Sequence, residues 1–180
     1  MTREPGSNET GSAKSEAGKP VSKAQRTRLI KLMQDDEFLG LPKVLAMGGK
    51  AIPILQSLLS DSEQPYHIRH RALICLGEIA DPAGYDIAAG FLNHSDPVFR
   101  IAATRAITRI DAGKAATLLA DNLEDDDASV CNTKLHCLAE TGHHCARHAL
   151  EHFHEKTEDT FLRSAAKKSL QRLKEVERHA

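Results

Sequence analysis

A residue pattern in this chain returns every 31 or 32 positions. Arg69 and Arg100 are 31 positions apart, and Arg163 follows 63 positions after Arg100. The apolar residues beside these arginines keep the same offsets: Ala72, Ala103 and Ala166, then Ile79, Ile110 and Leu173. The missing middle copy is predicted within 127–141, where Val130, Leu135 and Leu138 are in register. A fixed period of this length is typical of stacked supersecondary units.

Each unit is predicted to be a pair of helices. Apolar residues recur at helical spacing, and the dipeptides Asp81-Pro82 and Asp96-Pro97 each join an N-capping side chain to a proline suited to the first helical turn. Because the connections are short, neighbouring helices should run antiparallel. The second helices of the four units are predicted at residues 50–59, 82–93, 113–123 and 143–154.

The two ends of the chain differ from the repeats. Residues 1–21 are rich in Gly, Ser, Glu and Lys and are predicted to be a disordered tail. Ser22 and Gln25 match a capping box, so the repeat domain is predicted to span 22–180. A last helix at 158–177 would close the stack with a polar face. The expected fold class is therefore an all-α superhelix of about four helical hairpins with terminal capping helices.

Composition narrows the classes of partner. Aromatic residues make up 4% of the chain, so the core should be aliphatic. The net charge is -1, which disfavours nucleic acid as a partner. Residues 1–20 lack the apolar run of a secretory signal, and no stretch approaches the roughly 20 apolar residues of a membrane-spanning helix. We expect a cytoplasmic protein that does not enter a membrane and keeps its thiols reduced.

One stretch carries a family resemblance. Residues Asp96, Pro97, Val98, Arg100, Ala102, Ala103, Ala106, Ile107 and Ile110, with Leu76, Gly77 and Ile79, resemble the HEAT-like repeats of phycobilisome lyases. The resemblance covers about residues 36–175. It implies an α–α superhelix whose second helices line the concave side, and a structural role for Arg69, Arg100 and Arg163. The fourth unit departs from the pattern, since Cys131 and Lys134 stand where Arg and a small residue are expected.

A histidine-rich segment at 143–154 supports one alternative, a metal-binding or metal-dependent protein. In a helix, His144, His148 and His152 would form one stripe, and Cys145 lies three positions before His148. Imidazole and thiolate are ligands of transition metals, so these four residues are the candidate metal site. A solvated polar helix face explains the same pattern and is the favoured interpretation.

Another polar run invites a cation-binding interpretation. Glu124, Asp125, Asp126 and Asp127 stand before an expected helix. No calcium-loop spacing follows, so we interpret the run as helix capping.

The leading functional hypothesis is a scaffold or adaptor that binds another protein through its second helices. Its predicted contact residues are Gln56, Tyr85, Asp86, Thr117, Asp121, His148 and His152. Tyr85 is the predicted anchor, with a half-buried packing residue as the alternative. No nucleophile elbow or Gly-rich phosphate loop is recognisable, so no catalytic residue and no cofactor is predicted beyond the metal alternative.

Overall fold

The computed structural model describes residues 21–34 and 39–179, so nearly all of the predicted tail, 1–21, lies outside the described residues. Within those two ranges the chain forms helices and no strands, which confirms the all-α fold class. The α-helices are α1 (Lys23–Met33), α2 (Leu41–Leu45), α3 (Ile52–Leu59), α4 (Tyr66–Ile79), α5 (Tyr85–Ala89), α6 (Pro97–Ile110), α7 (Ala112–Ala120), α8 (Ala128–Glu140), α9 (His144–Lys156) and α10 (Thr160–His179).

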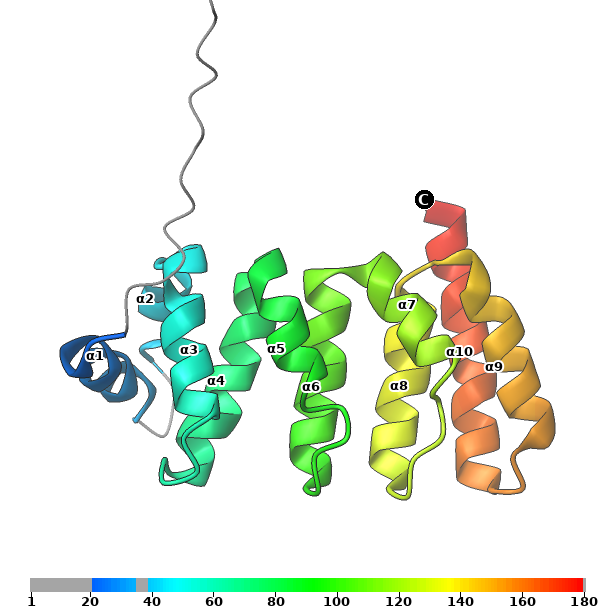
Figure 1. Ribbon diagram of the computed structural model, residues 1–180. Coiled ribbons are helices and arrows are strands. Elements are labelled where there is room, and N and C mark those ends of the chain that lie inside the picture. The colour runs from blue at the N-terminus through cyan, green and yellow to red at the C-terminus, as the bar shows by residue number, and fades with distance from the viewer. Residues whose placement is uncertain (1–20, 35–38, 180) are drawn as a thin grey trace, which may run out of the picture.

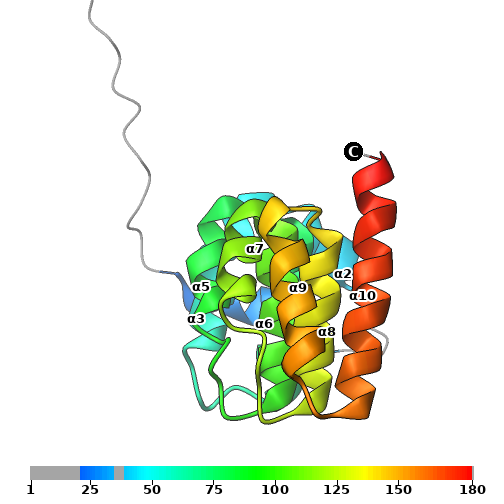
Figure 2. The same cartoon turned by 90° about the vertical axis from the view of Figure 1, so that its right-hand side faces the viewer.

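The helices stand in two layers (Figure 1). The first helices of successive units, α4, α6, α8 and α10, pack side by side in one layer. The second helices, α3, α5, α7 and α9, form the other layer, which the turned view of Figure 2 separates from the first. At one end α1 packs on α2 and α3, and at the other end α10 covers α8 and α9. The predicted stack of hairpins with capping helices is confirmed.

Side-chain caps start several helical segments where the sequence predicts. Ser22 and Gln25 form a capping box at α1. The Asp81 carboxylate accepts a hydrogen bond from the Ala83 N–H, and Asp96 accepts one from the Val98 N–H, each with proline in the first turn. These contacts satisfy N–H groups that the first turn leaves without a helical partner.

Two predicted second helices differ from the observed ones. The segment 82–93 is not one helix, because its first turn is a 3-10 helix, Pro82–Gly84, and α5 ends at Ala89. Gly90 follows, and turns rather than a helix continue to residue 93. The segment 50–59 begins in a second 3-10 helix, Gly48–Ala51. The remaining predicted second helices lie within two or three residues of α7 and α9.

The core is aliphatic, as the low aromatic content predicts. Leu55, Leu76 and Leu138 are fully buried, and Phe99 is the aromatic ring among the largest fully buried side chains of the described residues. None of the described helices is both long enough and apolar enough to span a membrane.

Candidate partner-binding surfaces

Six of the seven predicted contact residues are exposed on the second-helix layer. We define the second-helix surface by these six: Gln56 on α3, Asp86 on α5, Thr117 on α7, Asp121 after α7, and His148 and His152 on α9. They are drawn from four different units. A partner that touches several of them would therefore require the stack of repeats.

Tyr85, the predicted anchor, is not an exposed residue, and this is a correction. Its side chain is 5% exposed, and the Lys114 ammonium lies 4.0 Å from the centre of its ring. Burial raises the pKa of the Tyr85 hydroxyl, with a smaller contribution from the charges of Asp111 and Asp86. Lys114 also bridges to Asp86, with Nζ 3.0 Å from Oδ1. Tyr85 is thus a packing residue beneath a salt bridge that joins α5 and α7.

The end of α7 and the facing side of α9 enclose a cleft of about 500 Å³. Asp121, His148 and His152 line it together with Cys145. These side chains come from two successive units, so the repeat stacking brings them together. Of the predicted residues, Gln56, Asp86 and Thr117 lie outside this cleft.

The four predicted metal ligands, His144, Cys145, His148 and His152, do not form a cluster. In residues 21–34 and 39–179 no three His, Cys, Asp or Glu side chains are grouped so as to hold a metal ion. Burial raises the pKa of the Cys145 thiol, which disfavours the thiolate that binds metals. The nearest imidazole to that thiol is His143, whose Nδ1 lies 3.1 Å from Sγ and which caps α9.

The repeated arginines occupy equivalent positions. Arg69, Arg100 and Arg163 are each the fourth residue of a first helix, α4, α6 and α10. The Arg100 guanidinium donates to the His94 carbonyl oxygen at 2.8 Å, and that of Arg163 donates to the Thr157 carbonyl oxygen at 2.5 Å. In both cases the acceptor lies six residues earlier, so the predicted structural role is confirmed for these two. Arg69 instead lies over the Phe99 ring.

Asp125 joins two units through a buried ion network that the sequence analysis missed. Its carboxylate lies 2.7 Å from Nη2 of Arg100 on α6 and 3.2 Å from Nζ of Lys134 on α8. All three side chains are at most 9% exposed. The acidic run is therefore only partly a helix cap: Asp127 caps α8, as predicted, whereas Asp125 balances two buried cations.

We expect this network to make stability depend on pH. Burial raises the pKa of the Asp125 carboxyl, but hydrogen bonds from Arg100, the Asp127 N–H and Lys134 outweigh it and lower the pKa to about 2. A folded-state pKa below the ordinary value of 3.8 means that the contribution is present above pH 3.8 and is lost as the pH falls towards 2. The melting-temperature difference between wild type and Asp125→Asn should therefore shrink across that window. A difference that is constant from pH 5 to pH 2 would contradict this assignment.

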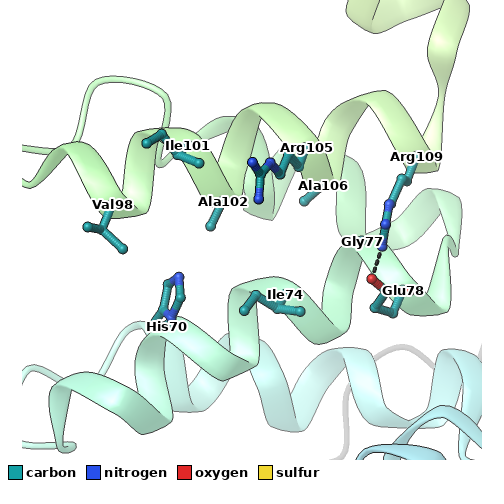
Figure 3. A pocket seen from close by; sticks show the side chains of 10 residues that line it. All are labelled: His70, Ile74, Gly77, Glu78, Val98, Ile101, Ala102, Arg105, Ala106 and Arg109. Carbon is teal, nitrogen blue, oxygen red and sulfur yellow. Dashed lines mark ion pairs between the residues drawn. The ribbon is translucent and has the colours of Figure 1, made fainter. Parts of the chain in front are cut away.

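A groove of about 340 Å³ runs between α4 and α6 on the opposite face, the first-helix face (Figure 3). Ile74 points into it from α4, and Ile101 and Arg105 do so from α6. The ion pair of Arg109 with Glu78 closes one end. The groove is not predicted from the sequence, because its residues occupy ordinary helix positions there.

The comparisons with known proteins agree with the architecture. The family model described as HEAT repeats matches residues 52–139 and 87–171. Together these matches span 52–171, which is two thirds of the 180 residues. No curated protein matches the chain. The matched segment contains the helices from α3 to α9 and most of α10. The chain belongs to the HEAT-repeat family.

Proposed function

We propose that the chain is a scaffold or adaptor that holds a partner protein on its second-helix surface. Stacked helical repeats create extended surfaces of this kind, and members of such families use them for binding. The observation that carries the proposal is the cleft between α7 and α9, in which Asp121, His148 and His152 converge from successive units. A cleft with the carboxylates of Asp121 and Glu124 and two imidazoles suits a partner with hydrogen-bonding and basic groups.

The test is affinity purification of the native chain and of an Asp121→Lys, His148→Asp variant from cells that express it. Both residues are exposed and neither makes an ion pair with a described residue, so folding should be unaffected. We expect at least one specific partner to fall by about tenfold, because the two substitutions reverse the charge pattern of the cleft. Lys43→Glu on α2 is the control and should retain every partner. An unchanged set of partners with the double variant would refute the proposal.

Three narrower predictions stay untested. The metal alternative has no supporting cluster among the described side chains, although a metal could still be measured in purified protein. The narrower likeness to the repeats of phycobilisome lyases, and the cytoplasmic location, likewise stay predictions. None of them enters the proposal above.

A further inference from the structure

The first-helix face has two grooves that are equivalent in the repeat. One is the groove between α4 and α6, and the other, of about 410 Å³, lies between α8 and α10. All eight residues that line the second groove correspond to residues of the first, at an offset of 62 on α8 and 63 on α10. The same hollow thus recurs two units further along the stack.

The two grooves also have side chains of the same kind at equivalent positions. At one end each has an exposed apolar side chain, Val98 in the first and Phe161 in the second, 39% and 57% exposed. Further along, each has an exposed basic side chain, Arg105 in the first and Lys168 in the second. In each groove one exposed apolar side chain and one cation lie on the same helix, about two turns apart, and this combination occurs twice.

Each groove contains a basic residue that is already in an ion pair and one that is not. At the far end of each groove an ion pair joins the two helices, Arg109 with Glu78 and Arg172 with Glu140. In contrast, neither Arg105 nor Lys168 makes an ion pair with any other residue that the structure describes. Each groove therefore offers one cation to an incoming anion.

We propose that the first-helix face binds an acidic peptide segment of a partner protein, with one apolar side chain in each groove and one carboxylate at Arg105 and at Lys168. The second-helix layer is unfavourable for such a segment, because it exposes the carboxylates of Asp121 at the end of α7 and of Glu151 on α9. Like charges would repel it there. The proposal concerns a different face from the second-helix surface and does not depend on it.

The distance between the two grooves determines how far apart the two acidic–apolar motifs of the peptide should be. Packed helices lie about 8–10 Å apart, so grooves two helices apart are separated by roughly 16–20 Å. An extended chain advances about 3.3 Å per residue, so the two acidic–apolar motifs should be about five or six residues apart. Engaging both grooves at once raises the affinity well above that of either motif alone.

The experiment uses a phage library of random twelve-residue peptides, selected on the full chain. We expect enriched peptides to carry an acidic residue about three positions from an aliphatic or aromatic one, with two such motifs about five or six residues apart. A labelled peptide of the consensus sequence is then titrated by fluorescence anisotropy. Arg105→Glu and Lys168→Glu should each weaken binding by about tenfold, and the double variant should abolish it.

Controls separate this site from general charge and from the proposed scaffold surface. Lys43→Glu makes the same charge change elsewhere, and Asp121→Lys with His148→Asp alters the second-helix surface, so both should bind the peptide as wild type does. If the double reversal fails to fold by circular dichroism, Arg105→Gln with Lys168→Gln replaces it. No enrichment, a basic or neutral consensus, or unchanged binding by the double variant would overturn the proposal.

Discussion

Replacing Asp125 by Ala is expected to destabilise the protein by about 3–5 kcal/mol, the cost typical of removing one partner from a buried ion network. Asp125 receives two bonds from Arg100, Nη2 to Oδ1 at 2.7 Å and Nε to Oδ2 at 3.2 Å. It also lies 3.2 Å from the ammonium of Lys134. Without it, Arg100 would keep the exposed Asp126 and two carbonyl oxygens, and Lys134 would keep the Glu124 carbonyl oxygen. Both cations would lose the buried counter-ion that they share between α6 and α8. The melting temperature should fall by about 6–20 °C, at roughly 2–4 °C per kcal/mol for a chain of this size.

The neighbouring Asp126 is a matched control for that substitution. It has the same side chain and also contacts Arg100, with Oδ1 2.5 Å from Nη2, but it is 89% exposed. An exposed ion pair contributes about 0–1 kcal/mol, so Asp126→Ala should lower the free energy of unfolding by no more than that. Urea denaturation followed by circular dichroism measures both variants. Equal losses for the two variants would show that burial of the network does not determine its contribution.

The ion network of Asp125 could not be predicted from the sequence, although the fold could. The period of 31 or 32 residues was enough to predict the fold class, the pairing of helices and the register of the arginines. In the fourth unit Cys131 stands where the other units have arginine, and Lys134 stands where the repeat has a small residue. The repeat pattern therefore gives no role for Lys134. In the structure Lys134 supplies a cation from one turn further along, because Asp125 lies within its reach. A repeat pattern predicts which residues occupy equivalent positions. It does not predict which side chains of different units come into contact.

The candidate surfaces were predicted less completely for a similar reason. Helical spacing placed Asp121 and the α9 histidines on an exposed face, and this is confirmed. Spacing could not show that Tyr85 is covered by Lys114, since that contact joins two units. The grooves of the first-helix face were also missed. Their signal in the sequence is that Val98 and Phe161, and likewise Arg105 and Lys168, are 63 positions apart, which is the repeat offset.

Replacing Gly77 by Ala should also destabilise the protein, against the usual preference for alanine in helices. Gly77 lies within α4, where the exchange of glycine for alanine ordinarily stabilises by about 1 kcal/mol. Here a Cβ at position 77 would lie 2.8 Å from the Cα of Ala106 on α6, which is backbone and cannot move aside alone. Overpacking of this kind costs about 1–3 kcal/mol, so the expected net change is a loss of up to about 2 kcal/mol.

Gly113→Ala is the control for the direction of the stability change, because it makes the same exchange in α7 without the close contact. A Cβ there would meet nothing nearer than the Asp111 carboxylate at 3.7 Å, so this variant should be as stable as wild type or more stable. Thermal unfolding measured in parallel should move the two melting temperatures in opposite directions. If Gly77→Ala were also stabilising, α4 and α6 could separate without cost. The α4–α6 groove would then be adjustable rather than set by the contact of Gly77 with Ala106.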